Sequence, residues 1–268
     1  MTFRVLTFVT ELKQYDAMRG SFVAAGFGDG ACVYAMVDNT CGNTGDPYSA
    51  VNEVLDDMTE PYLIVVHQDV LLDRCAGRDD LLERLRELDH GHPGWAVAGT
   101  AGMSFDQQAV VSVHDPWALP LWPGPWPVEV QTLDEHFLVI RAAARARFSP
   151  ELSGFHWYAT DLCLRARRLG ERAYVIDFPL THLSRGTPSD DYHRVRRMLQ
   201  QCHGPHYRFG VVVASTGVRV VLSRLRWLRS VTDHPRVLDV LTAGGSTRFA
   251  RLLRRPYGVA AGHGDRQA

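Results

Sequence analysis

The sequence predicts an α/β protein with a mostly parallel sheet flanked by helices and with a helical C-terminal extension. Apolar runs typical of strands alternate with segments of helical periodicity through the first hundred residues. The run Tyr62–Val66 is apolar, rich in β-branched residues and bounded by Pro61, as in a strand buried on both faces. Polar clusters follow three of the expected strands. In open α/β sheets such strand ends form the ligand-binding edge.

The elements of the first hundred residues follow in order along the chain. The expected helices are 15–25, 48–58 and 78–88, and the expected strands are 4–9, 31–37, 62–66 and 95–101. The glycine-rich piece 26–30 follows a helix rather than a strand. It therefore predicts a helix C-cap and a turn, and not a phosphate-binding loop.

The three polar clusters predict a nucleotide-type site at one edge of the sheet. An acid two residues after a histidine suits a divalent cation that takes its remaining ligands from a phosphate-bearing substrate. The alternative is that Asp69 caps a turn and that His67 is a satisfied strand-edge histidine. The clusters are Thr10-Glu11, Asp38-Asn39 and His67-Gln68-Asp69.

The second half departs from simple alternation. Residues 115–127 contain five prolines and three tryptophans, which excludes a helix or a central strand. This segment is either a stiff loop over the core or a wall over the site, in which Trp122 would pack against a sugar ring. A strand pattern around Asp134 and Glu135 follows over 128–140. Residues 148–161 then lead into a helix over 162–170, a strand over 173–178 and the pair Thr181-His182.

Four of these motifs, taken in order, resemble glycosyltransferases of the GT-A fold. The likeness is greatest to the glycosyltransferase-like family named after a streptomycin-biosynthesis protein, and it covers about residues 4–184. The motifs are the strand ending in His67-Gln68-Asp69, the segment Leu133-Asp134-Glu135, the segment Gly154–Asp161 that enters a helix, and Val175–His182.

The resemblance implies a role for each matching residue. Asp69 and His182 would hold a divalent metal, with His67 and Gln68 at the donor nucleotide. Thr10, Glu11, Asp38 and Asn39 would contact the base and ribose. Asp161 would be the general base of an inverting reaction, and Asp134 or Glu135 would be a reserve base. The expected sugar contacts, to donor or acceptor, are Asp134, Glu135, His156, Trp157 and Trp122.

Chemical reasoning independently supports a metal and a base. The departing diphosphate needs its charge neutralised, which Mg²⁺ or Mn²⁺ can do, and a mixed carboxylate–imidazole site suits Mn²⁺ better. An inverting displacement also needs a base for the acceptor hydroxyl. Asp161 has an alternative explanation as a helix N-terminal acid, and His182 as a partly buried strand-end histidine.

The region after Ser184 differs in composition. From Asp190 to the end, fourteen arginines stand against five acids. Amphipathic basic stretches over 218–231 and 248–255 would form a solvated face, a homodimer contact or a peripheral contact with an anionic membrane. The expected division is a catalytic domain over 1–184, a helical arginine-rich region over 185–258 and a disordered tail over 259–268.

Composition narrows the cellular setting. The net charge of −1 gives no argument for nucleic acid, and the five scattered cysteines favour a reducing compartment. We find neither a signal peptide nor an apolar stretch of membrane-spanning length, so a cytoplasmic protein is expected.

The sequence therefore predicts a metal-dependent, inverting hexosyltransferase-type enzyme. It would move a sugar from a nucleoside diphosphate sugar to an acceptor hydroxyl. The alternatives are a sugar-nucleotide hydrolase or nucleotidyltransferase on the same scaffold, and a non-catalytic nucleotide-binding or interaction protein.

Overall fold

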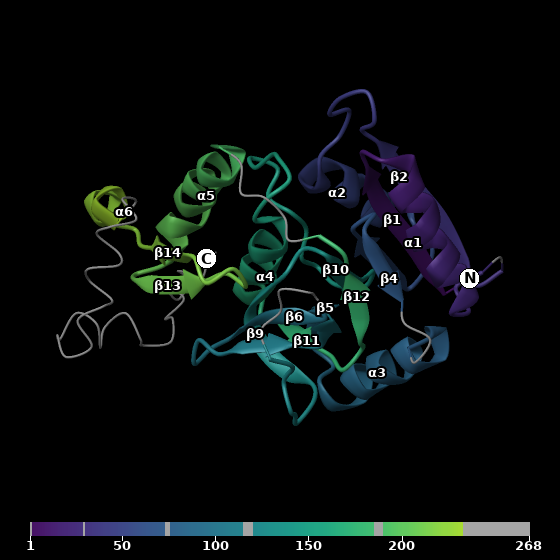
Figure 1. The fold of residues 1–268 in the computed structure, drawn as a ribbon. Helices are drawn as coiled ribbons and strands as arrows, with labels where there is room; N and C mark the ends of the chain where they lie inside the picture. The colour runs from purple at the N-terminus through teal and green to yellow at the C-terminus, as the bar shows by residue number, and fades with distance from the viewer. Residues whose placement is uncertain (1, 29, 73–75, 115–119, 185–189, 233–268) are drawn as a thin grey trace, which may run out of the picture.

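A nine-stranded sheet forms the centre of the protein (Figure 1). The structure is a computed structural model that describes residues 2–28, 30–72, 76–114, 120–184 and 190–232. The strand order within these residues is β2-β1-β3-β10-β5-β11-β9-β6-β7. The strands are β1 (Phe3–Val9), β2 (Cys32–Asp38), β3 (Tyr62–Val66), β5 (Trp95–Gly99), β6 (Ala101–Ser104), β7 (Ala109–Val111), β9 (Val128–Leu133), β10 (Phe137–Arg141) and β11 (Arg172–Val175).

The sheet is mixed, and most of its strands share one direction. Strands β1, β2, β3, β5, β6 and β11 run one way, and β7, β9 and β10 run the other. Because β1, β2 and β3 are parallel neighbours, their carboxyl ends lie side by side at one edge of the sheet. The predicted α/β class is confirmed.

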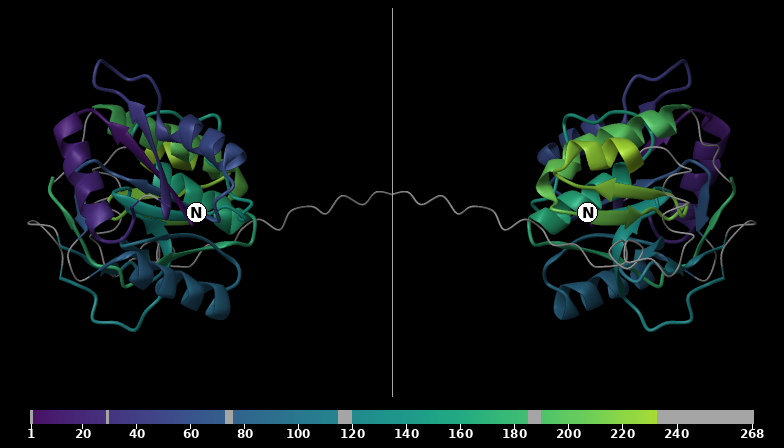
Figure 2. Two further views of the ribbon diagram at one scale, coloured as in Figure 1. Left: turned by 90° about the vertical axis from the view of Figure 1, so that its right-hand side faces the viewer. Right: turned by 90° about the vertical axis from the view of Figure 1, so that its left-hand side faces the viewer.

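Helices cover both faces of the sheet. Helices α1 (Leu12–Ala24) and α3 (Arg78–Gly91) contribute to the hydrophobic cluster on one face. Helices α2 (Pro47–Asp57), α4 (Tyr158–Arg168) and α5 (Asp190–His203) contribute to the cluster on the other. Figure 2 shows α1 and α2 on opposite sides of β1.

Strand β3 has the two-sided burial expected from its sequence. Leu63 and Val65 belong to one hydrophobic cluster, whereas Ile64 and Val66 belong to the other. Side chains alternate between the faces of a strand, so this apolar run supplies both core layers. Tyr62–Val66 is therefore the central strand that the sequence predicts.

A small second sheet brings residues distant in sequence to the end of β3. It contains β4 (Val70–Leu72), β12 (Leu180–His182) and β8 (Val113–His114), in the order β4-β12-β8. In the antiparallel pairing of β4 with β12, His182 stands opposite Val70. The N–H of Leu183 also donates to the carbonyl of Asp69 at 3.0 Å. This pairing places His182 next to Asp69.

Two of the expected strands are in fact pairs of strands. Residues 95–101 divide into β5 and the start of β6, and residues 128–140 divide into β9 and β10. The second break occurs at Asp134, whose carboxylate accepts from both the N–H and the ring Nδ1 of His136 at 3.2 and 2.7 Å. This local turn ends β9 and sends the chain to β10, which lies beyond β11 and β5 in the sheet.

The arginine-rich region is not wholly helical as predicted. Between α5 and the short α6 (Arg226–Thr232), it forms a 3-10 turn (Gly204–His206) and a hairpin of β13 (Gly210–Val213) and β14 (Arg219–Leu222). The β-branched runs favour strands, and Gly217, with φ of +80°, allows the turn between them. The stretch 248–255 and the tail 259–268 lie outside the described residues.

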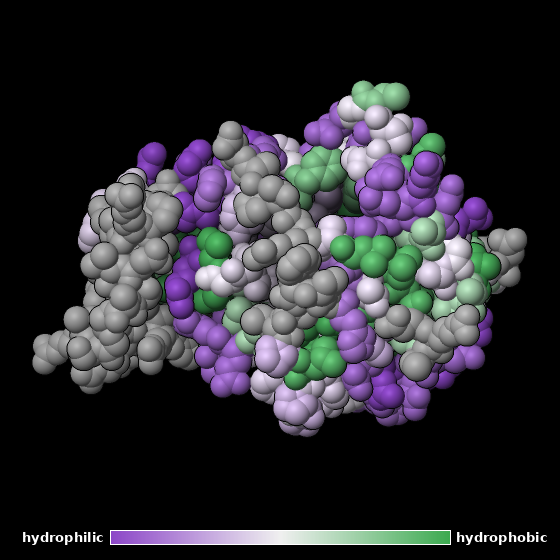
Figure 3. Space-filling model, viewed as in Figure 1, coloured by the Kyte–Doolittle hydropathy of each residue, from purple (hydrophilic) through white to green (hydrophobic). Residues whose placement is uncertain are grey.

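The surface of the described part is mainly hydrophilic in the view of Figure 3. Hydrophilic residues cover α3, whereas hydrophobic patches interrupt them over α1, where Leu12 and Val23 are exposed. Within the described ranges, none of the helices combines the length and apolar character needed to cross a membrane.

Candidate functional site

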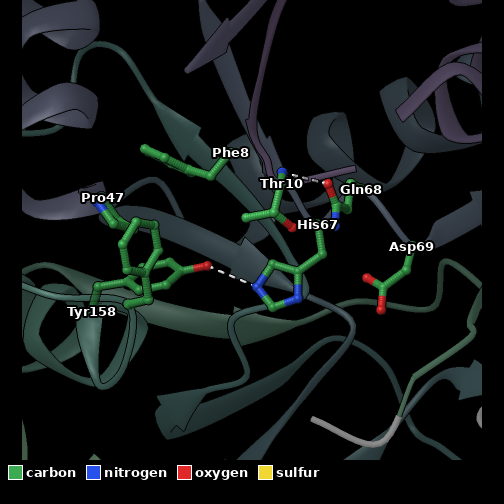
Figure 4. Close-up of a pocket in the computed structure, with 8 residues that line it drawn as sticks. Phe8, Thr10, Pro47, His67, Gln68, Asp69 and Tyr158 are labelled. Carbon is green, nitrogen blue, oxygen red and sulfur yellow. Dashed lines mark hydrogen bonds between the residues drawn. The ribbon is translucent and has the colours of Figure 1, made fainter. Parts of the chain in front are cut away.

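A pocket of about 300 Å³ opens at the carboxyl ends of β1 and β3 (Figure 4). This volume is at the lower end of the range of about 300–1,000 Å³ found for small-molecule sites. Its lining combines apolar side chains with the polar strand-end residues Thr10, His67, Gln68 and Asp69. The structure therefore brings together two of the three polar clusters singled out from the sequence.

Gln68 ties the ends of β1 and β3 together. Its Oε1 accepts from the N–H groups of Thr10 and Glu11 at 2.8 and 3.0 Å, and its Nε2 donates to Thr10 Oγ1 at 2.8 Å. These three bonds use most of what the amide can offer. Gln68 therefore positions the floor of the pocket, while its expected contact with a nucleotide stays a prediction.

The cluster after β2 shapes a loop beside the pocket. Asp38 accepts from the hydroxyl and the N–H of Thr40, and these hydrogen bonds, the hydroxyl first, lower the pKa of its carboxyl. Buried Asn39 bonds to Thr44 and Gly45 and closes the loop back on itself. Asn39 thus has a structural task. Neither Asp38 nor Asn39 lines the pocket, so their expected base and ribose contacts stay predictions.

Three side chains converge next to the pocket as a candidate metal centre. One ligand atom from each of His67, Asp69 and His182 lies within 4.8 Å of the other two. The Nε2 of His182 is 3.4 Å from Asp69 Oδ1, and each of these side chains is 13% exposed. Two imidazoles and a carboxylate are a donor set that suits a transition metal. The residues present therefore fit a divalent cation.

The surroundings favour the metal-binding protonation states of these residues. Burial lowers the pKa of His67 to about 4, against the opposing effect of Asp69, so its ring is neutral near pH 7. Burial alone would raise the pKa of Asp69, but hydrogen bonds from His182 and Ser184 lower it below its ordinary value. Neutral imidazole and ionised carboxylate are the forms that bind cations.

Tyr158 lines the pocket on the side opposite Asp69, and Glu135 lies next to Tyr158. The Tyr158 hydroxyl lies 3.1 Å from His67 Nε2 and donates to the backbone carbonyl of Glu135 at 2.9 Å (Figure 4). Burial and the nearby charge of Asp134 raise the pKa of the Glu135 carboxyl well above its ordinary value, against hydrogen bonds from backbone N–H groups at the start of α4. Glu135 is thus a carboxyl that holds its proton more tightly than an ordinary glutamate does.

Asp134 makes its contacts within the protein. Its Oδ1 accepts from His136 Nδ1 at 2.7 Å, and its Oδ2 accepts from the Ser215 hydroxyl at 2.6 Å. Burial raises the pKa of this carboxyl, but His136 and Ser215 together hold it well below its ordinary value. Asp134 is therefore an ionised, hydrogen-bonded group, and its predicted sugar contact stays untested.

The surroundings of Asp161 do not suit the predicted general base. The side chain is fully buried. Its Oδ2 accepts from the Ser149 N–H at 2.8 Å, and its Oδ1 accepts from Ser149 Oγ at 2.7 Å and pairs with His203 Nε2 at 2.6 Å. A carboxylate that is fully buried and surrounded by protein donors has no access to an acceptor hydroxyl. The structure corrects this assignment, because Asp161 joins α4 to α5.

A comparison with curated proteins places the chain in a family. It is 35% identical over 209 residues to the "ATP synthase subunits region ORF 6" protein of Fuscovulum blasticum, over 75% of this chain and 83% of that protein. The chain belongs to the family of this ORF 6 protein. No protein-family model matches the sequence.

Solved structures that are similar to the present protein include glycosyltransferase-type proteins. GalNAc-T7, solved with UDP, GalNAc and Mn²⁺, matches with a TM-score of 0.51 at 7% identity, over 75% of this chain and 48% of GalNAc-T7. TarS of S. aureus matches with a TM-score of 0.48 at 15% identity, over 75% of this chain and 39% of TarS. The chain thus spans less than half of each. The likeness to GalNAc-T7 confirms the predicted GT-A-like fold, while the streptomycin-type subfamily stays a prediction.

Three predicted sugar contacts lie outside the pocket lining of this ORF 6 family member. Trp157 is buried, and its Nε1 donates to the Tyr192 carbonyl at 3.1 Å, so it packs α4 against α5 and cannot stack on a sugar. His156 is half-buried, with its ring against Tyr192. Trp122 lies beside β7, at the far edge of the sheet from β1, since its N–H donates to Val111.

The sequence analysis missed the apolar walls of the pocket. Phe8 and Phe155 meet edge to face, with ring centroids 6.0 Å apart, and Pro47 begins α2 on the same side. Phe8 belongs to a strand, and its position two residues before Thr10 is the one signal that could have indicated it. Phe155 lies within the segment Gly154–Asp161, but the sequence analysis assigned it no role. Aromatic walls of this kind suit a flat ring such as a nucleobase.

Proposed function

We propose that this protein is a metal-dependent glycosyltransferase that moves a sugar from a nucleoside diphosphate sugar to an acceptor hydroxyl. The observation that carries the proposal is the convergence of His67, Asp69 and His182 beside a pocket at the strand ends of a GT-A-like fold. Mn²⁺ in the structure of GalNAc-T7 supports the same choice of ion here.

The pocket would hold the nucleoside end of the donor. Phe8 and Phe155 offer aromatic faces, and the strand-end N–H groups and Thr10 are already fixed by Gln68. A pocket held rigid before binding costs less entropy when the ligand enters. The diphosphate would extend from this pocket toward Asp69.

His67, Asp69 and His182 would hold the metal ion. When bound, such an ion neutralises the charge of the departing diphosphate. Three protein ligands leave coordination positions for phosphate oxygens, as expected where cation and substrate bind together. The two imidazoles favour Mn²⁺ over Mg²⁺, since Mg²⁺ prefers oxygen ligands.

Glu135 is the residue that we assign as general base in an inverting transfer. It is only partly buried, and its backbone carbonyl accepts from the hydroxyl of Tyr158, which lines the pocket and contacts His67. Its raised pKa makes the carboxylate a stronger base than an ordinary glutamate, and in this role it would take the proton of the acceptor hydroxyl as the new bond forms. This assignment replaces Asp161, which is fully buried and bonded to Ser149 and His203.

A thermal-shift panel tests the donor site. UDP, GDP, dTDP and CDP are each added with and without Mn²⁺, at about 100 times the dissociation constant. One diphosphate with Mn²⁺ is expected to raise the melting temperature by about 5–10 °C, from about 2.7 kcal/mol of linkage. Asp69→Ala should remove this rise. Asp57→Ala, at an exposed aspartate on α2, should keep it.

Product analysis then tests transfer itself. The matching nucleoside diphosphate sugar is incubated with candidate acceptors, and the anomeric configuration of the product is read by NMR. A new glycosidic bond of inverted configuration supports the proposal. Release of free sugar alone would indicate a hydrolase, and the absence of a stabilising diphosphate would reject the donor site altogether.

A further inference from the structure

The C-terminal hairpin reaches the candidate metal centre through one side chain. Ser215 lies in the turn between β13 and β14, and its hydroxyl donates to Asp134 Oδ2 at 2.6 Å. The hairpin is held firmly in this place. Thr132 Oγ1 donates to the Val213 carbonyl at 2.7 Å, and the Val213 N–H donates to Gln131 Oε1 at 3.2 Å, both in buried surroundings.

Asp134 connects Ser215 to His136 by hydrogen bonds. The other oxygen of Asp134 accepts from the ring Nδ1 of His136 at 2.7 Å and from its N–H at 3.2 Å. On the far side of the ring, Nε2 lies 2.7 Å from Thr100 Oγ1. The His136 side chain is only 3% exposed, and both ring nitrogens have partners. Its orientation is therefore fixed, and neither nitrogen is left to bind a ligand.

His136 contacts two of the three candidate metal ligands. Its ring stacks on that of His182, with centroids 5.3 Å apart and planes inclined by 22°. Its backbone carbonyl accepts the N–H of His67 at 2.9 Å. A shift of His136 would therefore move one ligand ring directly and the backbone of the other.

We propose that Ser215, Asp134 and His136 form a positioning relay through which the C-terminal hairpin orients His182 and His67 for metal binding. The inference rests on the proposed metal-dependent function and deepens it. Residues that orient the ligands of a metal typically change its affinity by about 10–100-fold when they are altered. The relay makes the region after residue 184 part of the metal centre, and not an appendage to a self-sufficient catalytic domain.

Mn²⁺ affinity, measured on the full chain without substrate, tests the relay. Free Mn²⁺ is followed by electron paramagnetic resonance, and binding is confirmed by calorimetry. His136→Phe keeps an aromatic ring against His182 but loses the bonds to Asp134 and Thr100. It should weaken Mn²⁺ binding by about 10–100-fold. Ser215→Ala acts one step further away and should weaken binding by up to about tenfold.

Two variants of the same turn serve as controls. Ser215→Thr retains the hydroxyl and should restore Mn²⁺ affinity to within about twofold of the wild type, as an intact hydrogen bond predicts. Thr216→Ala removes a neighbouring hydroxyl that lies 3.0 Å from the hydroxyl of Tyr192, and not the one that bonds to Asp134. It should leave Mn²⁺ affinity unchanged, whereas a general loosening of the hairpin would affect both variants.

The outcomes separate this inference from the proposed function. Wild-type Mn²⁺ affinity in both His136→Phe and Ser215→Ala would overturn the relay while leaving the metal site intact. An equal loss of Mn²⁺ affinity in Ser215→Ala and Thr216→Ala would also overturn the relay. A wild-type protein that binds no Mn²⁺ would reject the metal site itself. If His136→Phe does not fold, the comparison of Ser215→Ala with Ser215→Thr decides the question.

Discussion

Two aspartate–histidine pairs of this protein have the same chemical groups and different surroundings. Asp69 and His182 lie 3.4 Å apart, each 13% exposed, beside the pocket at the end of β3. Asp161 and His203 lie 2.6 Å apart with no exposure at all. In the buried pair, Ser149 bonds to both oxygens of Asp161, so the protein supplies the partners that the charge requires.

The difference shows that access, rather than residue type, separates a working acid from a structural one. A buried carboxylate stabilises the fold only while its donors stay in place, because removing a partner leaves an uncompensated charge or polar group. A carboxylate at the rim of a pocket keeps directions free for a ligand. The pair at Asp69 is therefore accessible to a ligand, whereas the pair at Asp161 contributes only to the stability of the fold.

Substituting each of the two candidate bases separately is the strongest test of this comparison. Glu135→Gln should lower kcat by about 10²–10⁴-fold, because a positioned base contributes that much to proton transfer. Asp161→Asn should keep kcat within a few-fold per folded molecule, since Asp161 does not reach the pocket. Steady-state kinetics on folded protein, quantified by circular dichroism, provides the measurement. Full loss of turnover in folded Asp161→Asn would return the base to Asp161.

Stability should show the opposite order. Asp161→Ala should lower the free energy of unfolding by about 3–5 kcal/mol, because His203 and Ser149 lose a buried partner. Asp69→Ala should lower it by less than Asp161→Ala does, since both members of its pair keep 13% exposure and water can reach them. Urea denaturation of both variants without ligand provides the values. Equal destabilisation would show that the two pairs are both structural.

The raised pKa of Glu135 predicts a pH dependence of stability. A group whose pKa is higher in the folded than in the unfolded protein stabilises the fold below its unfolded value, about 4.5, and loses this contribution as pH rises through the folded value. Glu135→Gln has no ionisable group at this position, so it does not lose stability in this way as pH rises. Its stability relative to wild type should therefore rise with pH, by at most about 1.4 kcal/mol per pH unit. Urea unfolding at pH 5, 6, 7 and 8 measures it, and a flat difference would contradict the raised pKa.

The smallest expected effect concerns the floor of the pocket. Gln68→Ala removes three hydrogen bonds between the ends of β1 and β3, at an exposed position where water can replace them. The expected loss of stability is about 1 kcal/mol. Diphosphate affinity should fall as well, since the N–H groups of Thr10 and Glu11 lose their fixed position. Unchanged affinity in a calorimetric titration would limit Gln68 to a role in the fold.

Local patterns predicted much of the core and part of the site. The run Tyr62–Val66 specifies a two-sided strand through its β-branched residues, and it ends where His67 to Asp69 begin. The pairing of His182 with Asp69 was obtained from a resemblance and not from a pattern, since their proximity arises from β12 adding to β4. Phe8 and Phe155 were missed because a pocket wall has no sequence period of its own.

The sequence by itself determined the alternation of strands and helices, the central strand and the polar residues at its end. These follow from the hydrophobic period and from where apolar runs stop, which are local properties of the chain. Only the tertiary structure decided which acid is accessible. Asp161 and Glu135 carry the same group, but packing of α5 and Ser149 buries Asp161 fully, while Glu135 is only partly buried beside Tyr158. Burial depends on contacts between residues far apart in sequence, such as His203 with Asp161, and no local pattern contains them.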